Sequence, residues 1–156
     1  MKFDVVIIGG GIVGSSLALA LKDSGLNIAL IESRPPSTLP DDKGWDNRVY
    51  AISPGSISFL EDLKVWSAIN KNRIAPVHDM EIFGDDDSAR LDFSAYDAGM
   101  TELAFVIENR QLQTAAWNEL EKNSTKIEIF CPMQCTSIEW NDTHANVQLS
   151  DGKLLK

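Results

Sequence analysis

The opening stretch of the chain alternates between short apolar runs and a helical pattern. Residues 3–8 form an apolar run rich in β-branched residues, which is typical of a strand covered on both faces. After a glycine-rich turn, apolar and small residues recur at intervals of three and four, as in a helix, at Leu17, Ala20, Leu21 and Ser24. Gly25 predicts the end of that helix, and residues 27–31 predict a second strand. The pattern therefore predicts one βαβ unit.

The middle of the chain changes from helical to strand-like periodicity. Ser53 predicts a helix N-cap with Pro54 at the first helical position, and one helix or a pair of short helices is predicted to extend to about residue 70. Its apolar face is predicted to consist of Ile57, Leu60 and Leu63. Residues 79–83 and 90–93 alternate apolar and polar positions and predict a hairpin. Residues 103–107 predict a third strand, and we expect these strands to form a sheet separate from that of the βαβ unit.

The last third of the chain predicts a helix followed by a series of strands. Asn109 caps a helix over residues 110–122. Its buried side is predicted to consist of Leu112, Ala115, Ala116 and Leu120. Further strands are predicted at residues 126–130, 133–140 and 145–149. The pair Asp151-Gly152 predicts a hairpin turn, and the chain ends inside the strand that should follow, so we expect a shortened chain.

The turn after the first predicted strand has the spacing G-x-G-x-x-G at Gly9, Gly11 and Gly14. The first glycine permits a tight turn, the second lets a pyrophosphate approach the backbone, and the third lets the helix pack closely on the sheet. The helix offers free N–H groups and its positive dipole end to phosphates. Glu32, at the end of the second strand, can accept hydrogen bonds from ribose hydroxyls, and its charge would repel the 2′-phosphate of NADP. These residues predict a site for FAD or NAD.

Three arginines are candidate cofactor contacts, each with a more ordinary alternative. Arg34 could lean on an adenine ring or could be a solvated surface residue. Arg48 lies just ahead of the helix capped by Ser53, where a cation would suit the second phosphate of a dinucleotide, although spacing alone leaves that role open. Arg110 lies in the first turn of a helix, where the dipole favours an acid, so it either holds an anion or forms a surface salt bridge.

Composition and charge exclude several classes of function. The 156 residues, 44% hydrophobic and 24% charged, are typical of one soluble globular domain. The net charge of −9 disfavours a nucleic-acid partner. No apolar run reaches the roughly 18 residues that span a bilayer, and no signal peptide is predicted. Cys131 and Cys135 are expected to be reduced thiols of a cytoplasmic protein, and no metal site is predicted beside them.

Two further segments are informative together with the glycine turn and Glu32. They are DNRVYAISPGSISFLEDLKVW at residues 46–66 and VIENRQLQTAAWNEL at residues 106–120. Together they resemble the FAD-dependent aromatic-ring hydroxylases of the para-hydroxybenzoate hydroxylase type, and most closely the branch of ubiquinone-biosynthesis hydroxylases. The resemblance spans essentially the whole chain, with the segments in the order of the family.

This resemblance implies an α/β fold. It combines a Rossmann-like FAD/NAD(P)-binding domain with a parallel sheet, a β-meander, and the first strands of a second, antiparallel substrate-domain sheet. The implied FAD-binding domain comprises residues 1–74 and 106–156, and it is incomplete at its carboxyl end. Residues 75–105 would form the partial substrate-domain sheet.

The resemblance also implies which residues contact FAD. The ADP half would be held by the turn and the residues after the second strand, namely Gly9, Gly11, Ile12, Val13, Gly14, Glu32 and Arg34. Arg48 would lie near the pyrophosphate, and Arg110 would contact FAD as well. No catalytic residue is expected in this chain, because the cofactor carries the difficult chemistry.

For the intact protein, the resemblance implies a monooxygenase that hydroxylates an aromatic, ubiquinone-precursor ring with NAD(P)H as co-substrate and O₂. The expected substrate is an aromatic or prenylated phenolic small molecule, and the expected location is the cytoplasm, with peripheral association with the inner membrane left open. Because later FAD segments of the family are missing here, the chain alone is expected to be inactive and to bind FAD weakly or not at all. Two alternatives remain: an FAD-dependent amine or amino-acid oxidase, or a non-catalytic nucleotide-binding module.

Overall fold

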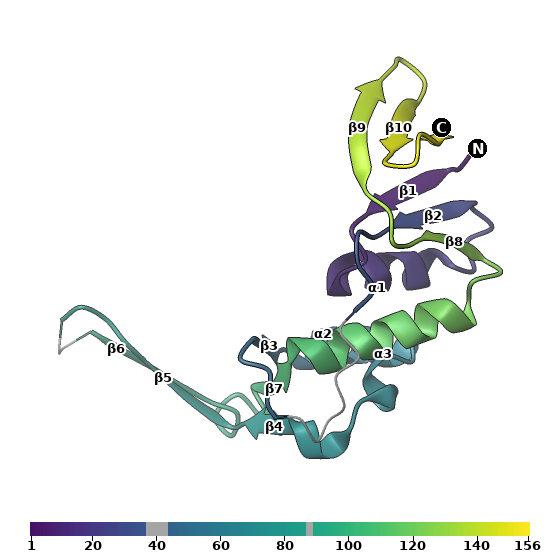
Figure 1. Cartoon of the computed structure of the whole chain (residues 1–156). Coiled ribbons are helices and arrows are strands. Elements are labelled where there is room, and N and C mark those ends of the chain that lie inside the picture. The colour runs from purple at the N-terminus through teal and green to yellow at the C-terminus, as the bar shows by residue number, and fades with distance from the viewer. Residues whose placement is uncertain (37–43, 87–88) are drawn as a thin grey trace. The chain divides into compact units, whose positions relative to one another are not determined.

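The computed structural model describes residues 1–36, 44–86 and 89–156, and the chain divides into two compact units (Figure 1). Unit 1 comprises Met1–Leu39 and Gln113–Lys156, and unit 2 comprises Pro40–Leu112. The sheets combine parallel and antiparallel strands, so the predicted α/β class is confirmed. In the part of the chain that the structure describes, no helix has the length and apolar character needed to cross a membrane.

Unit 1 contains the predicted βαβ unit, extended by a third parallel strand. Its elements are β1 (Val5–Ile8), α1 (Ile12–Leu21), β2 (Ile28–Ile31) and β8 (Ile127–Phe130). The strand order is β1-β2-β8, and Leu30 of β2 is in register with Ile7 on one side and Ile129 on the other. All four residues of β2 are buried, as expected for the central strand of a parallel sheet. The carboxyl ends of β1 and β2 therefore lie at the same edge.

Helix α1 buries a different face from the one its spacing predicts. Leu17, on the predicted apolar repeat, is 46% exposed. The buried residues of the helix are instead Ser15, Ser16, Ala18 and Leu19. Nearly every position of the helix is apolar or small, so periodicity cannot select one face. The turn that begins at Gly9 sets the orientation of the helix on the sheet.

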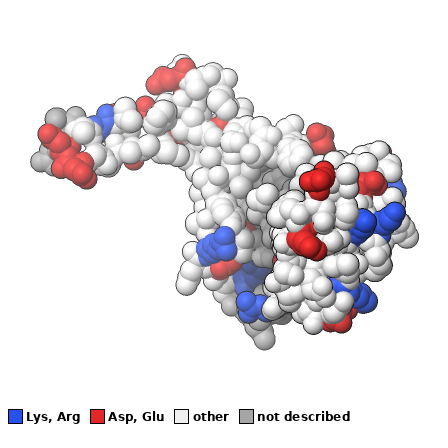
Figure 2. Space-filling view, turned by 90° about the horizontal axis from the view of Figure 1, so that it is seen from above, with Lys and Arg blue, Asp and Glu red and all other residues white. Residues whose placement is uncertain are grey.

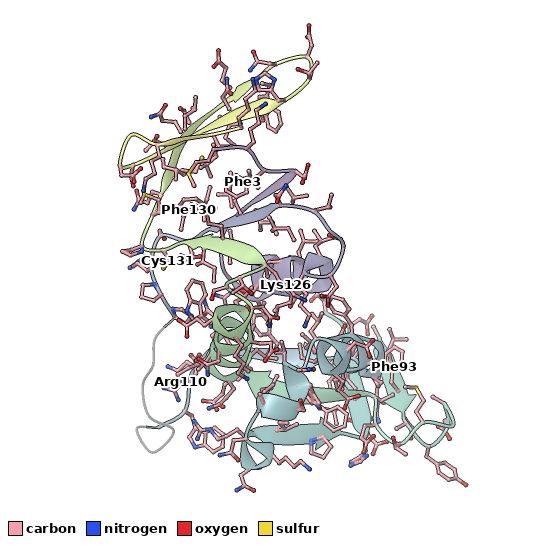
Figure 3. The ribbon with its side chains drawn as sticks, turned by 90° about the vertical axis from the view of Figure 1, so that its right-hand side faces the viewer. Phe3, Phe93, Arg110, Lys126, Phe130 and Cys131 are labelled. Atoms are coloured by element: carbon pink, nitrogen blue, oxygen red, sulfur yellow. The ribbon has the colours of Figure 1, made fainter. Side chains whose placement is uncertain are left out.

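A three-stranded antiparallel meander follows the parallel sheet and completes unit 1. It consists of β9 (Cys135–Trp140), β10 (Ala145–Leu149) and β11 (Leu154–Leu155). Its core contacts the parallel sheet through a buried apolar cluster of Ala29, Ile31, Phe130, Val147, Leu149 and Leu155. Phe3 and Phe130 pack edge to face with ring centroids 6.0 Å apart (Figure 3). The predicted meander is therefore present and shares a core with the βαβ unit.

Unit 2 is built on a second, antiparallel sheet of order β3-β7-β4. Its elements are β3 (Val49–Ile52), α2 (Pro54–Asp62), the 3₁₀ turns η1 (Trp66–Ala68) and η2 (Lys71–Arg73), β4 (Ile74–Val77) and β7 (Ala104–Glu108). The hydroxyl of Ser53 accepts a hydrogen bond from the Ser56 N–H at 3.3 Å and caps α2, as predicted. The predicted apolar face of Ile57, Leu60 and Leu63 is buried.

The predicted hairpin forms a two-stranded sheet of its own within unit 2, β5 (Asp79–Phe83) with β6 (Arg90–Ser94). The sequence predicts that residues 103–107 form a sheet with the hairpin. In the structure, strand β7 instead lies between β3 and β4. The reason is burial, because Ile107 of β7 is in the core whereas both hairpin strands are almost entirely exposed. Figure 2 shows acidic side chains at the hairpin tip, where Asp85 and Asp86 are exposed. The next residue, Asp87, lies outside the described residues.

Helix α3 (Asn109–Lys122) follows β7 directly, and its first turn belongs to unit 2 while the rest belongs to unit 1. The helix has the predicted bounds to within one residue. Its predicted buried side is confirmed at Leu112, Ala115, Ala116 and Leu120.

Candidate dinucleotide site

The glycine turn joins β1 to α1 and is tightly packed at Gly14. Gly9 has φ +105°, which side-chain-bearing residues rarely adopt. A Cβ on Gly14 would lie 1.9 Å from the carbonyl oxygen of Gly9, so this position has room only for glycine. The hydroxyl of Ser15, in the first turn of α1, donates a hydrogen bond to the Gly10 carbonyl at 2.9 Å and stabilises the turn. The first and third glycines of the motif therefore have the roles that the spacing predicts.

Gly11, by contrast, faces open space. No atom of the described residues lies within 4 Å of the position that its Cβ would occupy. It is the N-cap of α1, and the first turn of that helix contains no acidic residue to cancel the positive end of its dipole. Ile12 is half-buried and Val13 is exposed, so what the two can offer a ligand at this point is chiefly their backbone. An open cradle of backbone N–H groups at a helix start fits a diphosphate.

Glu32 points toward this turn. Its Oε2 accepts a hydrogen bond from the Gly10 N–H at 2.6 Å, and its Oε1 accepts from the Ser33 hydroxyl at 3.0 Å and the Arg34 N–H at 2.9 Å. Partial burial raises the pKa of this carboxyl, but the hydrogen bonds, that of Arg34 first, outweigh it and leave the pKa below its ordinary value. The side chain is thus a carboxylate at neutral pH, and Oε2 retains acceptor capacity for a ribose hydroxyl.

Gly10 is a site residue that the sequence analysis missed. A Cβ at this position would lie 2.9 Å from both Cβ of Glu32 and Cζ3 of Trp117. Trp117 is 7% exposed and donates its indole N–H to Glu121 Oε1 at 2.9 Å, so it is a core residue. Gly10 therefore permits the close contact that brings the carboxylate of Glu32 to the turn. The run of three glycines at residues 9–11 was the available signal.

A cavity of about 280 Å³ opens beside the turn and the acid. Its lining consists of Ile8, Gly9, Ile31, Glu32, Ser33, Met133, Gln134 and Cys135. The segment after β8 enters this lining because the Met133 N–H donates to the Glu32 carbonyl at 2.8 Å. The sequence analysis did not include that segment, since only the sheet order places it beside β2. The Arg34 side chain is exposed, and its contact with adenine stays a prediction.

Both cysteines are free thiols. Burial, and then the negative charges of Glu32 and Glu121, raise the pKa of the Cys131 thiol above its ordinary value. Within residues 1–36, 44–86 and 89–156, no three His, Cys, Asp or Glu side chains gather as metal ligands would.

The two other predicted arginines lie in unit 2. Arg48 is exposed, and its guanidinium lies 5.4 Å from the centroid of the Tyr50 ring. Arg110 is at the start of α3 (Figure 3), with its side chain 11% exposed. Its Nη2 donates to the Gly44 carbonyl at 2.8 Å and lies 3.5 Å from Glu108 Oε1, while its buried Nε has no hydrogen-bond partner among the described residues. Arg110 thus pairs with a buried carboxylate and does not form the surface salt bridge of the alternative interpretation, and its contact with FAD stays a prediction.

Arg73 is a second cation of this cluster that the sequence did not indicate. Its Nε lies 2.7 Å from Glu108 Oε2, and its Nη2 donates to Glu108 Oε1 at 3.0 Å. The contact between Arg73 Nε and Glu108 Oε2 is an ion pair without hydrogen-bond geometry. The guanidinium stacks on Trp45 at 3.9 Å from the ring centroid. Glu108, only 2% exposed, is therefore compensated by two arginines.

Comparison with known proteins agrees with this geometry. The family described as FAD dependent oxidoreductase matches residues 4–38, the stretch that holds the turn and Glu32. The 3-demethoxyubiquinol 3-hydroxylase of Escherichia coli is 31% identical over 98% of this chain and 39% of its own length. The mitochondrial ubiquinone biosynthesis monooxygenase COQ6 of Drosophila melanogaster is 33% identical over 97% of this chain and 33% of its own length.

The fold has solved counterparts as well. The crystal structure of p-nitrophenol 4-monooxygenase PnpA from Pseudomonas putida superposes with a TM-score of 0.71 at 20% identity, covering 99% of this chain and 39% of that one. At this identity the likeness concerns the fold alone. The chain is similar along nearly its whole length to the hydroxylase and the monooxygenase named above, matches the FAD dependent oxidoreductase family at its amino-terminal βαβ unit, and spans 39% and 33% of the length of those two relatives.

Proposed function

We propose that unit 1 binds the ADP half of FAD. The main support for this proposal is that Glu32 Oε2 accepts a hydrogen bond from the Gly10 N–H at 2.6 Å, while the space next to the adjacent Gly11 is empty of described side chains. Gly11 and the first turn of α1 would then hold the pyrophosphate, and Glu32 would accept from the adenosine ribose. The cavity lined by Met133 and Cys135 leaves space beside the acid for the rest of the nucleoside.

We further propose that Arg48 and Arg110 contact FAD, as the family resemblance implies. The buried Nε of Arg110, which has no hydrogen-bond partner in the described part of the chain, supports this role, because an ionised donor without an acceptor is costly unless a ligand supplies one. When bound, FAD supplies the redox chemistry, and the residues of this chain bind and orient it. No residue described above is assigned a catalytic role.

The domain division follows from the same proposal. Residues 1–74 and 106–156 would belong to the FAD-binding domain, and residues 75–105 to the first part of a substrate-domain sheet. The hairpin within that segment has one apolar, exposed face, with Met80 paired to Phe93 and Ile82 paired to Leu91. Such a face needs a cover, which further strands of a substrate domain would supply.

For the whole protein we propose hydroxylation of an aromatic, ubiquinone-precursor ring with NAD(P)H and O₂, at the periphery of a membrane. The names of both relatives support this reaction class. An FAD-dependent amine or amino-acid oxidase is less well supported, because oxidases and hydroxylases share the βαβ unit to which the family match is confined. Relatives that match along nearly the whole chain include hydroxylases and monooxygenases.

The test is flavin binding and turnover by a full-length protein that contains this chain. Titration with FAD should quench the flavin fluorescence, and phenolic substrates should stimulate NAD(P)H oxidation. Release of hydrogen peroxide driven by an amino acid, without nicotinamide, would favour the oxidase. Absence of flavin binding would refute the proposed function and leave the non-catalytic module. The chain of 156 residues alone should not turn over.

A further inference from the structure

One carboxylate in unit 2 holds the backbone of both arginines that we propose as FAD contacts. Asp46 Oδ1 accepts a hydrogen bond from the Arg48 N–H at 3.0 Å, and its Oδ2 accepts from the Arg110 N–H at 3.1 Å. The second bond satisfies a free N–H group in the first turn of α3 and places a negative charge at the positive end of the helix. Asp46 is therefore a capping residue supplied by a segment far away in the sequence.

A second, buried carboxylate holds the segment that carries Asp46. Glu108 Oε1 accepts a hydrogen bond from the Asp46 N–H at 2.5 Å, so the carboxylate contacts both that segment and the guanidinium of Arg110. The Gly44 carbonyl adds to this arrangement by accepting from Arg110 at 2.8 Å and from Arg73 at 2.9 Å. The segment is thus tied to the junction between β7 and α3 by charge-assisted bonds, which are the stronger kind.

This arrangement leaves one buried nitrogen of Arg110 without an acceptor among the described residues. Its Nη2 is directed to Gly44 and Glu108, whereas its buried Nε has no acceptor among the described residues. With Nη2 held, the planar guanidinium has a fixed orientation, and Nε is directed toward whatever acceptor completes the site. An arginine held in this way loses little side-chain freedom when it binds an anion.

We propose that Asp46 and Glu108 are positioning residues for FAD binding: Asp46 fixes the backbone at Arg48 and Arg110, and Glu108 fixes the guanidinium of Arg110. This inference rests on the proposed function, since it takes the two arginines as FAD contacts. Neither carboxylate contacts the cofactor, because two negative charges beside a pyrophosphate would oppose its binding. Their effect on affinity must therefore pass through the arginines.

A double-mutant cycle in the full-length protein tests this coupling. Glu108→Gln and Arg110→Met should each raise the dissociation constant of FAD about tenfold, as loss of a charge-assisted hydrogen bond does. The double variant should bind FAD no more weakly than Arg110→Met to within about twofold, because the Arg110 guanidinium that Glu108 orients is then absent. Glu119→Gln is the matched control, a buried glutamate of α3 that pairs with Lys122, and it should leave FAD affinity unchanged.

Asp46→Asn provides a second variant that keeps the side-chain volume of a partly exposed residue. In the amide an NH2 group replaces one of the two carboxylate oxygens, so a donor would face the N–H of either Arg48 or Arg110 and that hydrogen bond would be lost. FAD affinity should fall while the urea midpoint changes little. Additive losses in the cycle, or unchanged affinity in both Glu108→Gln and Asp46→Asn, would overturn the positioning role. Unchanged affinity in Arg110→Met would instead refute the proposed FAD contact itself.

Discussion

Gly11 and Gly14 allow the binding and folding roles of the glycine turn to be separated. Gly11 has φ −67° and ψ −179°, an extended conformation that alanine adopts, and its Cβ would meet no described atom within 4 Å. In Gly11→Ala, the weaker N-cap costs about 0.5–1 kcal/mol, and the smaller entropy of the unfolded chain offsets about 0.4–1 kcal/mol. The free energy of unfolding should therefore stay within about 0.5 kcal/mol of wild type.

Gly14→Ala should behave in the opposite way. Its Cβ would lie 1.9 Å from the Gly9 carbonyl oxygen and 3.2 Å from Cγ2 of Ile7, and the first of these is backbone that cannot rotate aside. Overpacking of this kind costs about 1–3 kcal/mol, and a backbone clash belongs at the upper end of that range or above it. Urea denaturation followed by circular dichroism should show the loss.

Gly11→Ala should lose FAD affinity while its stability is retained, whereas the main effect of Gly14→Ala should be on stability. The new methyl group of Gly11→Ala would occupy the space that a diphosphate must enter. Loss of one charge-assisted bond to a phosphate, about 1.5–3 kcal/mol, raises the dissociation constant at least tenfold. Flavin fluorescence in the full-length protein measures this. If Gly11→Ala binds FAD as wild type does, the turn does not hold a diphosphate; if Gly14→Ala is as stable as wild type, the close packing is wrong.

Three further results are expected. Because the pKa of Glu32 is lowered in the folded protein, its hydrogen bonds to the turn stabilise the fold fully above the ordinary pKa of glutamate, and this stabilisation is lost as the pH falls through the lower, folded pKa. FAD affinity should therefore decrease over that acidic range in wild type but not in Glu32→Gln. The raised pKa of Cys131 predicts that its alkylation by iodoacetamide, followed by mass spectrometry, is slower at neutral pH than that of a free cysteine and accelerates only above the ordinary thiol pKa. Leu30→Ala, in a strand with 0% exposure at that residue, should lower the free energy of unfolding by about 2–5 kcal/mol, and a loss below about 1 kcal/mol would contradict its central position.

Local sequence patterns were sufficient for most elements and for the centre of the site. The βαβ unit, the helix capped by Ser53, the hairpin and the meander depend on periodicity and turn residues within a few positions of one another. Gly9, Gly14 and Glu32 have the geometry that their spacing predicts, because a strand followed by a tight turn and a helix leaves few alternatives.

Other features depend on contacts between distant segments. Gly10 is required because Trp117, from another helix, packs against it, and β7 pairs with β3 and β4 because burial favours a central position over the exposed hairpin. The capping hydrogen bond between the Arg110 N–H and Asp46 Oδ2 joins residues 64 positions apart, and the local sequence around either residue does not predict it. The sequence by itself determined the dinucleotide turn, the acid and the order of the elements, since these follow from short-range sterics and hydrogen bonding. Only the tertiary structure decided the buried face of α1, the cavity wall at Met133 and the arginine cluster, since burial and charge compensation there depend on which distant surfaces meet.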